Sequence, residues 1–189
     1  MDLRAVLIRT DAAAESVSNP WIKEWVRKMR GINFRYAEAS DYQPIISVVN
    51  EWWGGRTMAE MLPKLFLIHF RQTSFIAEKN GEILGFLIGF VSQTFPTEAY
   101  SHFIGVHPEY RKIGLGSALY ERFFHAVKRL GCNKVCCVTS PLNNGSVTFH
   151  LLMGFSIELS GMTDESSCVI KDYDGRGEDR VLLSKSLSA

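Results

Sequence analysis

The sequence has little of three features that commonly point to a function: an excess of one charge, a long apolar run, and internal repeats. Its 21 lysines and arginines balance 20 aspartates and glutamates, which leaves a formal net charge of +1. A chain without a strong overall field has no general attraction for nucleic acid or for an anionic membrane. No run approaches the ~18 consecutive apolar residues of a membrane span. We therefore expect neither nucleic acid nor a membrane among its partners.

Cysteines are also scarce, and they lack the C-x-x-C spacing that is typical of zinc and redox sites. The four are Cys132, Cys136, Cys137 and Cys168. The adjacent pair should point to opposite faces of a strand, so it is poorly placed to share a metal ion. We expect buried thiols in a reducing cytoplasm, with no metal and no disulfide.

The chain of 189 residues is 46% hydrophobic, which is enough for one sizeable core but not for two comfortable domains. We expect one domain over 32–189, preceded by an extension over 1–31. Apolar residues recur in the extension at helical spacing, namely Trp21, Ile22, Trp25, Val26 and Met29. Charged residues interrupt its first eleven positions, unlike a secretory signal. The short helix would pack on the domain, meet a partner, or lie upstream of a natural start at Met29.

Beyond Gly31 the periodicity changes repeatedly between helix and strand. It predicts strands over 33–39, 74–79, 83–91, 100–106, 134–139, 155–159 and 181–184. It predicts a first helix that is capped at Ser40-Asp41 and runs into the turn at Trp52, and further helices over 58–70, 115–130 and 144–153. Asn80-Gly81 is a strong hairpin signal, and Pro63 leaves a kink possible in the second helix. The polar run 172–179 reads as a solvated turn. Antiparallel strands early and a strand–helix–strand unit later indicate a mixed α/β sheet.

The stretch from Val106 to Phe124, VHPEYRKIGLGSALYERFF, joins a strand to an amphipathic helix through two glycines. Backbone N–H groups at such a turn point outward, and the helix dipole adds positive potential. Glycines permit the close approach of an oxygen-rich ligand such as a pyrophosphate. The Walker pattern is absent, and the dinucleotide-binding pattern lacks its third small residue, because Leu119 stands there. The loop therefore predicts a different kind of phosphate site, or a tight connection with no ligand.

Two motifs together give a specific resemblance. Arg111-x-x-Gly114-x-Gly116 follows a Val-x-Pro strand end, and Asn143, Ser146, His150 and Gly154-Phe155 follow downstream at a fixed spacing. This pattern resembles the GCN5-related N-acetyltransferase (GNAT) superfamily over about 32–159. The resemblance implies an acyl-CoA N-acyltransferase fold: a mixed, mostly antiparallel sheet flanked by helices and splayed at the cofactor cleft. It also implies acetyl-CoA as acyl donor, with the pyrophosphate on the loop and the pantetheine arm in the splay. The residues implied for binding are Ile104, Val106, Arg111, Lys112, Gly114, Gly116, Ser117, Asn143 and Ser146.

Acetyl transfer to an amine needs a neutral nucleophile, an oriented carbonyl and a proton for the leaving thiolate. Neutralising a lysine-like amine at pH 7 costs roughly 4–5 kcal/mol, whereas an α-amino group costs only about 1 kcal/mol. Many relatives have a tyrosine as acid where this chain has His150, which either donates that proton or only packs beside the cofactor. Candidate bases are Tyr100 and His102, on the strand where some relatives use a glutamate. Each also has a structural reading as a buried sheet residue.

The sequence alone is compatible with two functions. The first is an N-acetyltransferase that moves acetyl directly from acetyl-CoA to a primary amine of a small molecule or a peptide, as a monomer or homodimer. The second is an acyl-CoA sensor or interaction module without turnover, which the missing tyrosine allows. Trp52 and Trp53, in a connection that often borders the acceptor pocket of this family, fit either a substrate wall or core packing.

Overall fold

A computed structural model describes residues 27–158 and 168–187 of the chain. Within these residues the strands are β1 (Asn33–Tyr36), β2 (Phe75–Lys79), β3 (Glu82–Val91), β4 (Glu98–Val106), β5 (Lys134–Thr139), β6 (Ser156–Ile157) and β7 (Val181–Ser186). The helices are α2 (Tyr42–Trp52), α3 (Leu65–His69), α4 (Leu115–Arg129) and α5 (Asn144–Leu152). The extension predicted over 1–31 lies mostly outside the described residues, including Trp21 and Trp25. Among the described helices, none is long and apolar enough to cross a membrane.

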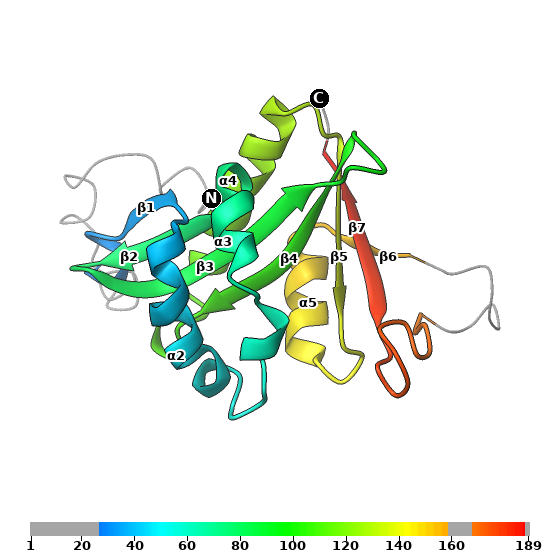
Figure 1. Cartoon of the computed structure of the whole chain (residues 1–189), viewed down its shortest axis with the longest axis horizontal. Helices are drawn as coiled ribbons and strands as arrows, with labels where there is room; N and C mark the ends of the chain where they lie inside the picture. Colours follow the sequence, from blue (N-terminus) through cyan, green and yellow to red (C-terminus); the bar gives the residue numbers. More distant parts are fainter. Residues whose placement is uncertain (1–26, 159–167, 188–189) are drawn as a thin grey trace, which may run out of the picture.

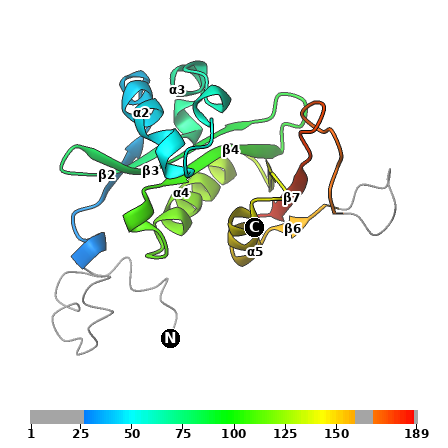
Figure 2. The same ribbon diagram turned by 90° about the horizontal axis from the view of Figure 1, so that it is seen from below.

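The strands form one mixed sheet in the order β1-β2-β3-β4-β5-β7-β6. Every pairing is antiparallel except that of β4 with β5. Figure 2 shows α2 and α3 above the sheet and α4 and α5 below it. This architecture confirms the predicted fold class, a mostly antiparallel sheet flanked by helices.

Each face of the sheet has its own core. Against α4 lie buried residues such as Leu87, Leu119 and Phe123, and against α2 lie others such as Ile45 and Phe86. The apolar residues of α4 recur on one side of the helix, so burial of that side holds the helix on the sheet. Both sides of the central strands are therefore covered, which explains the nearly continuous burial of β3.

The hairpin predicted at Asn80-Gly81 is confirmed. Asn80 and Gly81 have φ values of 52° and 83°, and β2 pairs with β3 on either side of them. Two consecutive residues with positive φ form the turn whose twist matches that of the flanking strands.

Two predicted elements are shorter than expected. The strand predicted over 33–39 ends at Tyr36, because the Glu38 backbone N–H donates to Asp41 Oδ2 at 2.7 Å and turns the chain. The helix predicted over 58–70 is broken into a 3₁₀ turn, Ala59–Met61, and α3. Leu62 between them is not helical, with φ −124° and ψ 73°. The break follows from Pro63, since a proline disfavours the helical conformation in the preceding residue.

The feature that matters most for function is the divergence of β4 from β5. The two parallel strands pair over only three residues, from Glu98–Lys134 to Tyr100–Cys136. Beyond that point β4 continues to Val106 while β5 pairs only with β7, and the two strands visibly diverge (Figure 1). We call the point of separation, just after Tyr100 and Cys136, the splay vertex. The splay expected between these two strands is present.

A bulge in β4 lies beside the splay vertex. Phe103 pairs with Ile88 and Ser101 pairs with Gly89, so His102 is an extra residue without its own partner on β3. A bulge of this kind re-aims the side chains that follow it. Ser101 consequently faces α4, while His102 and Phe103 both face the side of α2 and α3.

Candidate active site

The loop from 111 to 117 has the geometry of an anion cradle. Gly114 is the residue before α4 and has φ +89°, and Lys112 has φ +63°. The first N–H groups of a helix have no intrahelical partners and attract negative charge. A Cβ atom on Gly116 would lie 3.1 Å from Phe149 Cζ, so a larger residue at this position requires the Phe149 ring to shift. Ser117 follows in the first turn of α4 and is half-buried. The loop therefore fits a pyrophosphate.

Arg111 uses its guanidinium to fasten this loop to the rest of the protein. Its Nε donates to Val106 O at 3.1 Å, and its Nη2 donates to Trp52 O at the end of α2. The rings of Trp52 and His107 pack edge to face in the same place, with centroids 5.4 Å apart. The positive charge of Arg111 thus also meets the negative end of the α2 dipole. In this structure Arg111 positions the loop, while Lys112 is exposed.

The other predicted binding residues line the two sides of the splay. Ile104 and Val106 are half-buried on the side of β4 that faces α4. Across the splay, Asn143 precedes α5, and its Oδ1 accepts a hydrogen bond from Ser146 N at 3.2 Å. Asn143 thus fixes the start of α5, and Ser146 stands on the first turn of that helix.

His150 is buried inside a hydrogen-bonded group rather than open to the splay. Its exposed fraction is 4%. Nδ1 lies 2.7 Å from Ser146 O and 3.3 Å from Ser146 Oγ, and Nε2 lies 2.7 Å from the Tyr120 hydroxyl. A carbonyl oxygen can only accept, so Nδ1 carries a proton and the neutral ring accepts from Tyr120 at Nε2. Burial lowers the pKa of His150 below its ordinary value of 6.5, so the ring is neutral at pH 7.

The two other candidates, Tyr100 and His102, lie on the opposite face of the sheet. The His102 ring stacks on Phe66 with centroids 4.2 Å apart, and its Nε2 donates to Met61 O at 2.8 Å. This leaves the lone pair on Nδ1 of the neutral ring. Burial lowers the pKa of His102, which keeps it neutral and able to accept a proton. Burial raises the pKa of Tyr100, so its phenol keeps its proton at pH 7.

The structure thus brings the predicted residues together in two groups. Ile104, Val106, the loop, Ser146 and His150 surround the splay on the side of α4 and α5, whereas Tyr100 and His102 face α3 across the plane of the sheet. Trp52 belongs to the core, with 4% of its surface exposed. Trp53 packs half-buried on Phe86 and Phe103.

Sequence reasoning missed Tyr120 and Ser101, which hold His150 in place. Tyr120 is fully buried, and its hydroxyl lies 3.0 Å from Ser101 Oγ. Tyr120 falls on the apolar side of α4 and Ser101 falls on the alternating pattern of β4, so each looked like ordinary packing. A buried phenol needs a hydrogen-bond partner, which is the only signal that could have marked Tyr120.

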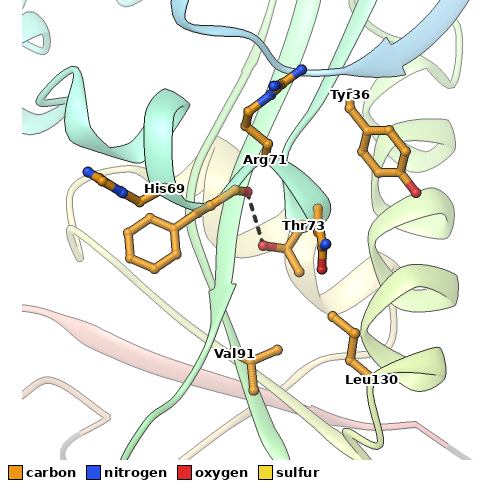
Figure 3. Close-up of a pocket in the computed structure, with 8 residues that line it drawn as sticks. Tyr36, His69, Arg71, Thr73, Val91 and Leu130 are labelled. Atoms are coloured by element: carbon orange, nitrogen blue, oxygen red, sulfur yellow. Dashed lines mark hydrogen bonds between the residues drawn. The ribbon is translucent and has the colours of Figure 1, made fainter.

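A separate hollow of about 600 Å³ lies away from the splay (Figure 3). It is lined by Tyr36, His69, Phe70, Arg71, Gln72, Thr73, Val91 and Leu130. Its Thr73 hydroxyl donates to Phe70 O and to Gly89 O, and Arg71 bonds Ala37 O, so these polar groups brace the fold. None of the predicted site residues lines this hollow.

Within the described residues no group of three His, Cys, Asp or Glu side chains could hold a metal ion. All four cysteines lie among these residues, and each is a free thiol. Burial raises the pKa of Cys137 to about 12, so it is a protonated thiol and a poor nucleophile at pH 7.

Comparison with known proteins agrees with this geometry. The acetyltransferase (GNAT) family profile matches residues 26–155, which is most of the chain. An acetyltransferase of Photorhabdus laumondii is 24% identical over 121 residues, covering 64% of this chain and 70% of that one. The chain therefore belongs to the GNAT family and is an acyltransferase. Acetyl-CoA is the acyl donor of this family.

Solved structures share the fold at low sequence identity. The ribosomal-protein-S18-alanine N-acetyltransferase of Escherichia coli is 21% identical with a TM-score of 0.59, covering 84% of this chain and 95% of that one. The diaminobutyrate acetyltransferase EctA of Paenibacillus lautus, in complex with L-2,4-diaminobutyric acid and coenzyme A, is 17% identical with a TM-score of 0.64, covering 84% and 96%. At these identities the likeness concerns the fold alone.

Proposed function

We propose that this protein transfers the acetyl group of acetyl-CoA directly to a primary amine of a small molecule or a peptide. The observation that carries the proposal is the splay: β4 and β5 pair over three residues and then diverge beside an anion cradle. From Val106 back to Ser101 the strand spans five residues, or about 17 Å. An extended pantetheine arm matches this length, so a pyrophosphate on the loop places the thioester near the splay vertex.

The chain's own residues divide the binding work between backbone and side chains. The N–H groups of the loop and of the first turn of α4 hold the pyrophosphate, and Gly114 and Gly116 let it approach. Lys112 adds a positive charge at the same end. Ile104 and Val106 line one side of the arm, and Asn143 and Ser146 line the other. A backbone N–H of β4 near the bulge orients the thioester carbonyl.

A thioester in the splay lies within the plane of the sheet, so groups on both faces can serve it. On the face of α3, His102 presents a bare Nδ1 that accepts the proton lost when the ammonium form of the acceptor becomes a neutral amine, before the attack. The Tyr100 phenol stays protonated beside it and orients the amine or a bridging water. On the other face, the buried His150 exchanges protons with the departing sulfur through the Tyr120 and Ser101 hydroxyls. Bringing the amine and the thioester together supplies most of the acceleration, and the histidines manage the protons.

Two kinds of acceptor amine fit the proposed reaction. The fold is shared by an enzyme named for a protein alanine and by one solved with a diamino acid. We therefore place both kinds of amine in the test. The free thiols and the neutral charge balance favour a cytoplasmic protein.

The test is the release of coenzyme A thiol from acetyl-CoA over a panel of amines, from diamino acids to peptides with free α-amino groups. Acceptor-dependent release that disappears in Gly114→Glu supports the proposal. Tight acetyl-CoA binding with no acceptor-dependent release would instead identify a sensor. If the protein does not bind acetyl-CoA at all, both the acetyltransferase and the sensor hypotheses are wrong.

A further inference from the structure

A chain of polar groups crosses the splay vertex and joins three elements. It runs from Ser101 on β4 through Tyr120 on α4 to His150 and Ser146 on α5. The distances along it are 3.0 Å, 2.7 Å and 2.7 Å. Ser101 and His150 are each 4% exposed, and Tyr120 is fully buried. Among the described residues no buried side-chain nitrogen or oxygen lacks a partner.

The hydroxyl groups in this chain can point in either direction. When the ring is neutral, Ser101 donates to the Tyr120 oxygen and Tyr120 donates to Nε2. When the ring carries a second proton, Nε2 donates to the Tyr120 oxygen and Tyr120 donates to Ser101. The bond from Nδ1–H to Ser146 O is the same in both states. A buried histidine is thus fully hydrogen-bonded in both of its charge states.

We propose that Tyr120, together with Ser101, is a positioning residue for acetyl transfer that allows His150 to take up and release one proton at the splay vertex. The inference rests on the proposed function and deepens it. When the amine adds to the acetyl carbon, a nitrogen–carbon bond forms, and the carbon–sulfur bond then breaks with its electron pair going to sulfur. The nitrogen loses one proton and the sulfur gains one. His150 takes up that proton through the Ser101 and Tyr120 hydroxyls and returns it by the same route to the sulfur, and the direction of the hydroxyl chain reverses at each transfer.

The surroundings of the ring suit this role. Among the described residues, Cys137 from β5 shares a hydrogen bond with the Tyr120 phenol and stays protonated, and the protonated Tyr100 phenol lies on the opposite face of the sheet. Phe149 and Phe155 pack edge to face on the imidazole. Lys185 of β7 lies farther out, over the Phe124 ring. The hydroxyl chain is therefore the group that meets the added proton directly.

The experiment compares Tyr120→Phe with the parent by two measurements. The first is an NMR titration of the His150 imidazole, which requires no turnover. Phenylalanine removes the acceptor for Nε2–H, and hydrogen bonds to a charged group are the stronger ones. The pH at which His150 titrates should therefore fall in the variant. The second is the kinetics, where kcat should fall by about 10- to 100-fold with little change in KM for acetyl-CoA.

Further variants separate this role from simple packing. Ser101→Ala should change both readouts in the same direction but less, because the phenol remains. The double variant should behave like Tyr120→Phe, since Ser101 reaches the ring only through Tyr120. Tyr42→Phe, which removes a hydroxyl from the surface of α2, is the matched control and should leave both readouts unchanged. If Tyr120→Phe does not fold, Ser101→Ala decides the question.

The inference is overturned if His150 titrates at the same pH and kcat is unchanged in Tyr120→Phe or, where that variant does not fold, in Ser101→Ala. It is also overturned if only KM for acetyl-CoA changes, because that result would assign the group to binding. If the parent protein releases no thiol with any amine, the proposed function is wrong. The NMR titration would still show whether the hydroxyl chain controls the pH at which His150 titrates.

Discussion

The two ends of the proposed cofactor cleft are built from different parts of the chain. At the phosphate end, the loop from 111 to 117 offers backbone N–H groups and depends on two glycines. At the splay vertex, side chains from β4, α4 and α5 meet in one buried hydrogen-bonded group. A site made of backbone tolerates many side chains but not a change of backbone conformation. A site made of interlocked side chains should respond to the loss of any member.

The largest effect is expected from breaking the phosphate end. Gly114→Glu puts a negative charge where the pyrophosphate binds and forces a side chain onto a residue with φ +89°. We expect acetyl-CoA affinity to fall at least about 100-fold, or some 2.7 kcal/mol. Calorimetric titration measures it. Gly114→Ala is the control for strain alone and should lose about tenfold.

The fold around Gly114 should survive, because nothing lies within 4 Å of a Cβ atom at this position. A circular dichroism spectrum like that of the parent checks this. Unchanged affinity for acetyl-CoA in Gly114→Glu would remove the pyrophosphate from this loop.

The next effect tests the vertex. His150→Phe keeps much of the ring volume but removes both nitrogens, and kcat should fall by roughly 10²–10⁴ with little change in acetyl-CoA affinity. His150→Tyr restores the phenol common in relatives and should keep much of the activity. Steady-state kinetics on a confirmed acceptor measure both.

If the phenylalanine and tyrosine variants both match the parent, His150 takes no part in proton transfer. Proximity alone would then carry the departure of the thiolate. Loss of acetyl-CoA affinity in both variants would instead mean that the vertex binds the arm.

A smaller effect distinguishes two neighbouring cations at the phosphate end. Arg111 holds the loop through Val106 O and Trp52 O, whereas Lys112 is exposed beside the cradle. Lys112→Ala should weaken acetyl-CoA binding and reduce its dependence on salt, since a screened charge–charge attraction is lost. Arg111→Gln should weaken binding by about tenfold through a looser loop, with the salt dependence kept. Calorimetric titration of each variant with acetyl-CoA at two ionic strengths distinguishes the two roles.

If Arg111→Gln reduces the salt dependence of acetyl-CoA binding and Lys112→Ala does not, then Arg111 turns from the two carbonyls to the phosphates when the cofactor binds. Melting temperature gives a second readout, because Arg111→Gln should destabilise the junction of the loop with α2. Lys112→Ala should leave the melting temperature near that of the parent.

The same comparison explains what could be predicted from the sequence. The loop, the hairpin at Asn80-Gly81 and α4 follow from local signals, namely glycines with positive φ and one apolar helix side. The reach of Arg111 to Trp52 spans 59 positions and depends on tertiary packing. The bulge at His102 depends on pairing with β3. Neither has a local signature. Local backbone conformation was therefore predictable from the sequence, whereas contacts between distant residues were not.

The partner of His150 shows what a local sequence pattern cannot predict. The spacing from Asn143 placed His150 correctly on α5, at a position that points inward. Its orientation, however, is set by Tyr120, thirty positions away, which the sequence analysis did not single out. The periodicity of a helix can indicate burial, but it carries no information about the partner of a hydroxyl group.

The smallest expected effect concerns the dependence of the protein's stability on pH. It involves one buried histidine on each face of the sheet. Burial lowers the pKa of both His102 and His150 from the ordinary value of 6.5. Between that value and the lower folded ones, the unfolded chain binds more protons than the folded protein. The free energy of unfolding should therefore fall as the pH drops below about 6.5, by at most about 1.4 kcal/mol per pH unit for each histidine. Urea unfolding at pH 7.5, 6.5 and 5.5 measures the slope. His150→Phe should flatten it, and the matched variant His125→Gln on the exposed side of α4 should not. A slope that His150→Phe leaves unchanged would mean that burial does not hold His150 neutral.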